Sequence, residues 1–442
     1  GFRGPQLEEK LAALQSSDRP FSTMMDAGVT ALDVWEMNQD ISNDPARGTC
    51  HTVNPEGVVV ETGEPFQVPP KEVLRAEGRP GGIGNAGRRI GEVLANEERE
   101  RNAPGAVAAV TRRRVMSLLG PISNDAVGQV YKDKIRGVDT ELLRPHPQMP
   151  GESGVSVIRV HGLENTPNVR KGDRAIVFRP GVNRKMTFTE DDLFEIYRRR
   201  PGIFHFSYPG FGPEAMDSPE DDGQTLAWVV DEVQKFCPIV SVDVHGPTEL
   251  CQIRRVLPCL DMVNGNLQEI ARILCGIEID ASKELSTEEK MALLERVLNQ
   301  GILPYLQKPT GRTRLFTVTD ARGCFAVLQP KNGQTQYGYL LSPFADIKAE
   351  NTTGAGDVRC GFQRWHIACN AMQKWQDGTF AWKDAALAVQ VGNGASAFHI
   401  QSPGPEAFEG VTLGRLEHLA QSGRSFSTIE QARAALARRK TS

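Results

Sequence analysis

Residues 351–357 read Asn351-Thr352-Thr353-Gly354-Ala355-Gly356-Asp357, and apolar side chains recur at helical spacing over the next fifteen positions. Glycines at the entrance to a helix leave backbone N–H groups unpaired, and the helix dipole adds partial positive charge, so this segment predicts an anion site. Asp357 would lie in the first helical turn, where its carboxylate can accept the proton of an attacking hydroxyl. The ordinary alternative is a loop whose aspartate only stabilises the helix N-terminus.

The chain before this segment alternates short β-branched runs with helical patterns. Strands are predicted at 202–208, 238–244 and 260–264, and helices at 225–236, near 249–257 and at 267–276. Such alternation is typical of βαβ units and a parallel sheet. Residues 312–330 then predict two strands around a tight turn, and two long helices are expected after residue 351.

The first half of the chain is less regular. Residues 7–16 predict an amphipathic helix, and Phe21 to Trp35 predict one strand that carries acidic residues toward its end. Residues 47–80 are rich in turns with short β-like pieces, which favours a small sheet that 154–160 could join. Residues 88–102 are helical in pattern and then highly charged, so we interpret them, with the charged stretch near 96–114, as a solvated surface insertion.

Composition narrows the possible partners. The 442 residues are 39% hydrophobic and 24% charged, enough apolar material for one large α/β domain or two smaller ones. The formal charge is -4, with 51 Lys plus Arg against 55 Asp plus Glu, so we expect neither nucleic acid nor an anionic membrane as partner. Eight cysteines without a CxxC pair, and no long apolar run, predict a soluble cytoplasmic protein with reduced thiols.

The segment at 351–357 resembles the D-T-T-G-A-G-D signature of the ribokinase/PfkB carbohydrate kinase family. The resemblance implies an α/β fold with a doubly wound, mostly parallel sheet flanked by helices and a small β-sheet lid. It implies a kinase domain over 21–442 after an N-terminal helical extension at 1–20, with lid segments at about 45–80 and 151–165. Asp357 would be the catalytic base, and the amides of Gly354, Ala355 and Gly356 would stabilise the phosphoryl group.

Further segments resemble the family in order along the chain. Residues 24–35 resemble the first strand, whose acidic residue binds substrate hydroxyls, and Asp33 matches better than Asp26. Pro80 to Ala86 resembles the G-G-x-x-x-N segment, which implies substrate binding by Gly81, Gly82 and Asn85, although the spacing to Asn85 is one residue short. Residues 118–128 and 178–187 also resemble family segments.

The second half of the chain carries the implied nucleotide and metal positions. Asn266 and Glu269 have capping-box spacing, but the family places its N-x-x-E here, so both become candidates for holding Mg²⁺. The turn at 317–323 would border the nucleotide through Asp320, Arg322 and Gly323, and Asn393 would belong to a closing loop after a helix at 384–391.

Several positions depart from the family pattern, among them Ser123, which replaces a glycine in the segment at 118–128. Asp320 replaces a glycine, Arg359 replaces an aromatic residue after the catalytic aspartate, and Asn351 replaces the leading aspartate of the signature. Cation affinity depends on ligand charge, so Asn351 implies little dependence on a monovalent cation.

The sequence therefore predicts an ATP- and Mg²⁺-dependent carbohydrate kinase, with a homodimer through the lid implied by resemblance only. A nucleoside kinase, an ADP-dependent sugar kinase and a non-catalytic sugar-phosphate-binding member are the alternatives. A dinucleotide-binding loop at 82–87 is disfavoured because Pro80 is a poor end for a central strand. A Walker phosphate loop is excluded because the chain contains no Gly-Lys pair.

Overall fold

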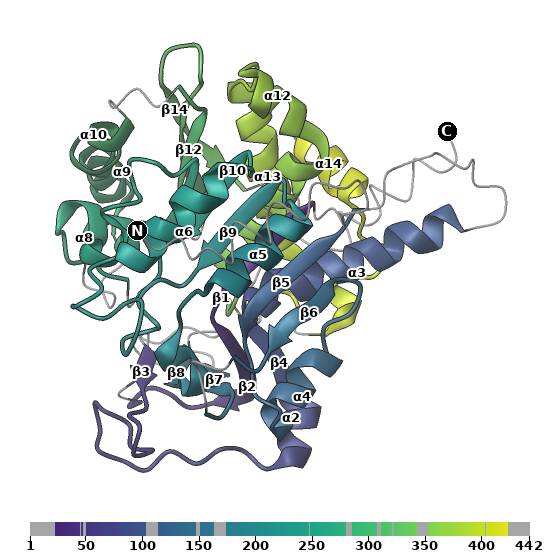
Figure 1. Cartoon of the computed structure of the whole chain (residues 1–442), viewed down its shortest axis with the longest axis vertical. Helices are drawn as coiled ribbons and strands as arrows, with labels where there is room; N and C mark the ends of the chain where they lie inside the picture. The colour runs from purple at the N-terminus through teal and green to yellow at the C-terminus, as the bar shows by residue number, and fades with distance from the viewer. Residues whose placement is uncertain are drawn as a thin grey trace.

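The computed structural model describes residues 23–44, 46, 50–102, 114–146, 151–162, 174–246, 248–279, 285–306, 311–320, 322–342, 352–402 and 404–422. Within them, two sheets form the framework (Figure 1). The larger sheet has nine strands, in the order β14 (Gln336–Leu341), β13 (Gly323–Gln329), β12 (Arg314–Thr319), β11 (Met262–Asn266), β10 (Ile239–Asp243), β9 (Ile203–Ser207), β1 (Met24–Gly28), β5 (Met116–Pro121) and β6 (Asp139–Arg144). The strands from β12 to β6 are parallel, whereas β13 and β14 are antiparallel.

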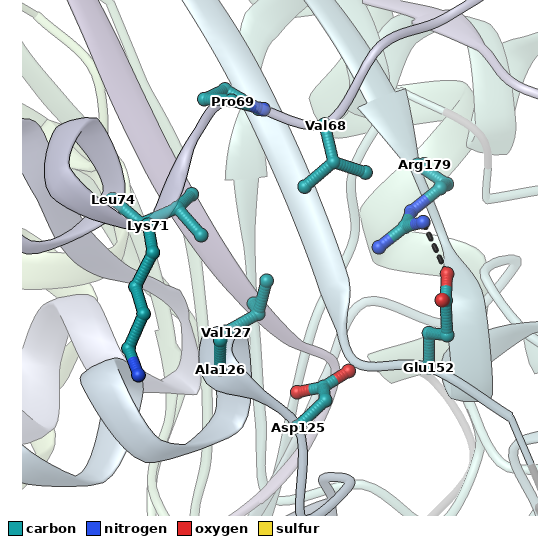
Figure 2. A pocket seen from close by; sticks show the side chains of 9 residues that line it. All are labelled: Val68, Pro69, Lys71, Leu74, Asp125, Ala126, Val127, Glu152 and Arg179. Atoms are coloured by element: carbon teal, nitrogen blue, oxygen red, sulfur yellow. Dashed lines mark hydrogen bonds and ion pairs between the residues drawn. The ribbon is translucent and has the colours of Figure 1, made fainter.

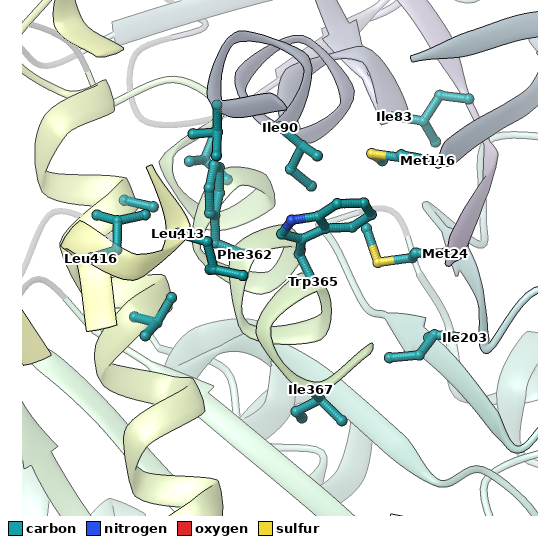
Figure 3. Close-up of a cluster of buried hydrophobic side chains, with 14 of the residues drawn as sticks. Met24, Ile83, Ile90, Met116, Ile203, Phe362, Trp365, Ile367, Leu413 and Leu416 are labelled. Carbon is teal, nitrogen blue, oxygen red and sulfur yellow. The ribbon is translucent and has the colours of Figure 1, made fainter. Parts of the chain in front are cut away.

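Helices cover both faces of this sheet. One face packs against α3 (Ile83–Arg101), α11 (Ala355–His366), α13 (Trp382–His399) and α14 (Leu413–Gln421), and the other against α5 (Glu190–Arg199), α6 (Gln224–Gln234), α8 (Leu267–Cys275) and α9 (Thr287–Arg296). Neighbouring residues such as Met24 and Met25 enter opposite cores, because side chains alternate along a strand. Trp365 of α11 lies at the centre of the first core (Figure 3). The shorter helices are α2 (Lys71–Glu77), α4 (Ala126–Asp133), α7 (Leu250–Ile253), α10 (Leu303–Leu306) and α12 (Met372–Asp377).

The second sheet has five strands and lies at the lower end of the molecule in Figure 1. Its order is β3 (Cys50–Thr52), β8 (Arg174–Arg179), β7 (Gly154–His161), β2 (Thr30–Gln39) and β4 (Gly78–Gly82). The expected doubly wound, mostly parallel sheet with a small second sheet is confirmed. Within the described residues, no helix is long and apolar enough to span a membrane.

The prediction of one continuous strand up to Trp35 is wrong. The chain leaves the larger sheet at Gly28 and enters the smaller one at Thr30. Gly28 has φ +144°, and a Cβ there would lie 2.4 Å from the carbonyl oxygen of Ser207, so a side chain cannot be accommodated at this transfer point. Periodicity did not reveal the break because both strands are apolar and extended.

The segment at 88–102 is not a surface insertion along its whole length. It belongs to α3, whose residues Arg88, Arg89, Ile90 and Val93 are buried, whereas its end beyond 97 is exposed. β4 immediately precedes this helix, so Pro80 does lie in a strand. That strand is the edge of the smaller sheet, where a missing N–H is tolerated.

The expected loop at 392–395 is also wrong, because α13 continues through it to His399. A Cβ at Gly392 would lie 2.4 Å from the carbonyl oxygen of Arg359. Glycine at position 392 therefore allows α13 to pack closely against α11, and it does not mark a turn. The predicted helix at 7–16, the extension at 1–20 and the stretch at 103–113 lie outside the described residues.

Candidate active site

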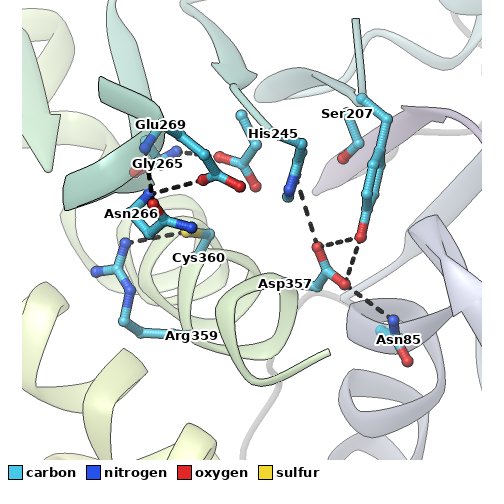
Figure 4. A network of polar contacts seen from close by, with 12 residues as sticks. Asn85, Ser207, His245, Gly265, Asn266, Glu269, Asp357, Arg359 and Cys360 are labelled. Carbon is cyan, nitrogen blue, oxygen red and sulfur yellow. Dashed lines mark hydrogen bonds and ion pairs between the residues drawn. The ribbon is translucent and has the colours of Figure 1, made fainter. Parts of the chain in front are cut away.

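Asp357 lies in the first turn of α11, directly after the glycine segment. Gly354 is the N-cap with φ +73°, and a Cβ there would lie 2.6 Å from the side chain of Asn85, so glycine is required on both counts. Only 8% of Asp357 is exposed. Its Oδ2 accepts a hydrogen bond of 2.9 Å from Nδ2 of Asn85, which comes from the first turn of α3 (Figure 4).

The remaining contacts of Asp357 come from residues that the sequence analysis did not single out. The hydroxyl of Tyr208 donates to both carboxylate oxygens of Asp357, at 2.6 Å each. Nε2 of His245 lies 3.9 Å from Oδ1, and the imidazole is stacked on the Tyr208 ring with centroids 3.8 Å apart. Tyr208 follows β9 and His245 follows β10, so both project from carboxyl ends of adjacent parallel strands. Ligands usually bind in the crevice at the carboxyl ends of parallel strands. The position of Tyr208 and His245 at or just after the ends of two predicted strands could therefore have identified both residues from the sequence.

Burial raises the pKa of Asp357, while His245 and the hydrogen bonds from Tyr208 and Asn85 oppose the rise. Burial and the neighbouring carboxylate of Asp357 raise the pKa of Tyr208 well above its usual value. The phenol therefore remains protonated and is available as a hydrogen-bond donor at neutral pH.

Asp33 of β2 faces the same region from the smaller sheet. Burial raises the pKa of its carboxyl to about 7, although a hydrogen bond from Ser156 lowers this pKa. The charge of Asp357 raises the pKa further, while Arg174 and Arg88 lower it. A Cβ at Gly81 would lie 2.3 Å from Oδ2 of Asp33, so this glycine leaves room for the carboxylate. Gly82 ends β4 with φ +56°.

The alternative aspartate, Asp26, lies inside the larger sheet instead. Its Oδ2 is 3.3 Å from Nη2 of Arg364, whose Nη1 is 3.2 Å from Oδ2 of Asp243. All three side chains are buried. Burial opposes ionisation of Asp243, but His205 and Arg364 outweigh it and hold its pKa well below the usual range. This ion network joins α11 to β1 and β10 and so anchors the helix that carries Asp357.

Asn266 and Glu269 form the capping box at the start of α8, as their spacing predicted. The Asn266 side chain accepts from the Glu269 N–H at 2.8 Å, and Oε2 of Glu269 accepts from the Asn266 N–H at 2.9 Å. Burial raises the pKa of Glu269, and His245 opposes the rise. In the described part of the chain, Oε1 of Glu269 accepts no hydrogen bond, and no group of three or more potential ligands is placed to hold a metal. One free carboxylate oxygen fits a Mg²⁺ ion that keeps most of its waters.

The predicted nucleotide residues fall on two elements. Asp320 lies in the turn between β12 and β13, where Oδ1 accepts from the N–H groups of Arg322 and Gly323 at 2.7 and 3.0 Å. The Asp320 side chain therefore stabilises this turn, at the position where the family pattern has a glycine. Asn393 is buried within α13 and donates to Oε1 of Gln390 at 3.2 Å. Asn351 lies outside the described residues.

Arg359, in place of the expected aromatic residue, is buried against strands β12 and β13. It donates to Oγ1 of Thr317 at 3.2 Å and to Sγ of Cys360 at 3.0 Å. Figure 4 shows it on the side of Asp357 that also carries Asn266 and Glu269.

Two cavities lie away from these residues. One, of about 280 Å³, is bordered by α2, the start of α4 and β8 (Figure 2). Three of its charged groups have partners, since Glu152 pairs with Arg179 and Asp125 caps α4. The other, of about 330 Å³, lies at the amino ends of β10 and β12. Neither cavity includes Asp357 or the residues around its carboxylate.

Comparison with known proteins supports the fold and nothing finer. No family model matches the chain, and no curated protein matches it by sequence. Similar solved structures include the ribokinase of Giardia lamblia, with TM-score 0.56 and 15% identity over 90% of this chain and 99% of that one. Arabidopsis thaliana ribokinase complexed with ribose and ATP has TM-score 0.53 and 14% identity over 92% and 99%. Anopheles gambiae adenosine kinase, in complex with a diadenosine tetraphosphate, has TM-score 0.52 and 14% identity over 88% and 98%. The chain has the ribokinase-like fold.

Proposed function

We propose that this protein is a PfkB-type carbohydrate kinase, which transfers the terminal phosphoryl group of ATP to a hydroxyl of a sugar. The observation that carries the proposal is the carboxylate of Asp357, held by hydrogen bonds in the first turn of α11 beside the glycine segment and electrostatically coupled to Asp33. Solved structures with this fold include ribokinases and an adenosine kinase. A nucleoside hydroxyl is therefore the second candidate acceptor.

The proposed mechanism uses residues of both sheets. Asp33 and the backbone of Gly81 and Gly82 orient the acceptor hydroxyl, under a lid formed by the segments at about 45–80 and 151–165. Asp357 removes the hydroxyl proton as the phosphoryl group moves. The N–H groups of Gly354, Ala355 and Gly356 stabilise the charge on the transferred group.

On the donor side, the nucleotide is bordered by Asp320, Arg322, Gly323 and Asn393. Asn266 and Glu269 would hold Mg²⁺ through water, and the bound ion supplies neutralisation of the polyphosphate charge. No covalent intermediate is needed, so positioning and electrostatics account for the catalysis. A non-catalytic role is disfavoured because Asp357 and Glu269 are both present at the site.

The proposal is tested by incubating the full chain with ATP, Mg²⁺ and a panel of sugars and nucleosides. ADP release should depend on one acceptor class, and the phosphorylated product should appear by ³¹P NMR. Replacing ATP with ADP as donor separates the ATP-dependent from the ADP-dependent alternative. A chain that binds ATP but phosphorylates no member of the panel would contradict the proposal.

Glu269→Gln should raise the Mg²⁺ concentration needed for half-maximal activity several-fold, because the negative charge that holds the hydrated ion is lost. Glu289→Gln is the matched control, since Glu289 forms the same capping box with Ser286 at the start of α9. The control should leave the Mg²⁺ titration unchanged. If the curve of Glu269→Gln also overlays that of the wild type, Glu269 has only its capping role.

The acceptor KM should fall as the pH rises through about 7. The pKa of Asp33 is raised to about 7 by burial, so its carboxyl is neutral below that pH and becomes a stronger hydrogen-bond acceptor above it. KM is measured at saturating ATP from about pH 6 to about pH 8.5, since the transition centres on the raised pKa. Asp33→Asn should remove the dependence. An acceptor KM that does not change over this range would exclude Asp33 as a ligand of the hydroxyl.

A further inference from the structure

The position of the Tyr208 hydroxyl restricts how an acceptor can reach Asp357. The phenolic oxygen lies 2.6 Å from Oδ1 and 2.6 Å from Oδ2, midway between the two carboxylate oxygens. A hydroxyl carries a single proton, so both oxygens share it in a three-centre hydrogen bond. The phenol therefore occupies the position between the two oxygens from which another hydroxyl would donate.

Two further groups lie close to the carboxylate. Asn85 donates to Oδ2 at 2.9 Å, and Nε2 of His245 is 3.9 Å from Oδ1. Asp357 itself is buried, whereas Tyr208 is half-buried. Tyr208 is therefore the more exposed of the two residues.

Tyr208 is held firmly in this position. Its backbone adopts φ +67°, which is rare for a bulky residue and persists only where the surroundings enforce it. His245 stacks on the ring with an interplanar angle of 7°, and Phe211 packs edge-on against it with centroids 5.5 Å apart. Displacing the phenol to admit an acceptor would disrupt both ring contacts. In the described part of the chain, no donor is hydrogen-bonded to the phenolic oxygen, which leaves its lone pairs available.

We propose that Tyr208 is a catalytic residue that relays the acceptor proton to Asp357. The proposal rests on the phosphotransferase function proposed above. The acceptor hydroxyl donates to the phenolic oxygen, and its proton passes to Tyr208 as the phenolic proton passes to Asp357. The acceptor oxygen bonds to the γ-phosphorus, the bond from that phosphorus to the β,γ-bridging oxygen breaks, and ADP leaves with the electron pair.

Electrostatics support a concerted relay rather than a free tyrosinate. Burial and Asp357 keep the pKa of Tyr208 well above its usual value, so the phenol gives up its proton only as it receives another. The ionisable groups that interact with Tyr208 or Asp357 from the surrounding elements include His245, Asp33, Asp243, Glu269, Tyr131 and Cys360. The carboxylates among them disfavour a second negative charge at the phenol.

The first test is Tyr208→Phe, which keeps the ring and its stacking but removes the hydroxyl. Single-turnover rates should fall by a factor on the order of 10², the contribution of a positioned proton-transfer group, while ATP-analogue binding is unchanged. Tyr197→Phe on α5 is the matched control, since Tyr197 packs against Phe236 far along the chain from Asp357. It should turn over like the wild type. A Tyr208→Phe rate equal to or above the wild-type rate would show that the acceptor reaches Asp357 directly, and the relay would be wrong.

The second test uses the wild-type chain, so it does not depend on how the variant folds. Single-turnover rates are measured in mixtures of H₂O and D₂O. A plot of the rate against the deuterium fraction should be curved, because two protons move together. A linear dependence, typical of one proton, overturns the relay even if the protein is a kinase. Wild-type protein without any turnover contradicts the proposed function, and the relay with it.

Discussion

Asp357→Asn should lower turnover by a factor on the order of 10²–10⁴, the range found when a positioned base is removed. An amide cannot accept the proton that passes from the acceptor hydroxyl, whether directly or through Tyr208. ATP binding should be nearly intact, because the predicted nucleotide positions Asp320 and Asn393 lie on other elements than Asp357. The checks are single-turnover kinetics and calorimetric titration with a non-hydrolysable ATP analogue.

The matched control for this variant is Asp377→Asn, at the exposed end of α12, where the carboxylate accepts from Gln373. It should behave as the wild type in both measurements. Thermal melting of both variants separates a chemical defect from a loss of folded protein. Near-wild-type turnover of folded Asp357→Asn would remove Asp357 from its proposed role.

Arg364→Met should destabilise the fold by about 3–5 kcal/mol, the usual cost of removing one partner from a buried ion pair. Arg364 is 1% exposed, and its guanidinium lies between the carboxylates of Asp26 and Asp243, at 3.3 and 3.2 Å. Without it, both carboxylates lose their shared cation in the interior. Urea unfolding measures the loss.

Two further variants test the cause of that loss. Arg254→Met breaks an exposed pair with Asp222 and should change stability little, because solvent screens such pairs. Adding Asp26→Asn to Arg364→Met should recover part of the loss, because it removes one uncompensated charge. If Arg364→Met is no less stable than Arg254→Met, the buried network does not hold α11 in place.

The sequence by itself predicted the strands and helices from residue 200 onward and the position of Asp357 at the start of a helix. The alternation of strands and helices from residue 200 onward is a local pattern, since each element has the periodicity of the surface it buries. The paired strands β12 and β13, the capping box of Asn266 and Glu269, and the glycine entry to α11 are also local features. Each depends on residues within a few positions of one another, so a single sequence is enough to predict it.

Only the tertiary structure decided how distant segments meet. The change of sheet at Gly28 is imposed by the backbone of Ser207, and α13 runs through Gly392 because α11 packs closely against it. Tyr208 and His245 reach Asp357 from strand ends that lie more than 100 residues earlier in the chain. Periodicity and capping describe a residue's neighbours along the chain, whereas these contacts depend on which strands lie side by side. The groups around the Asp357 carboxylate are therefore a product of the strand order β1-β9-β10 and the helix docked above it.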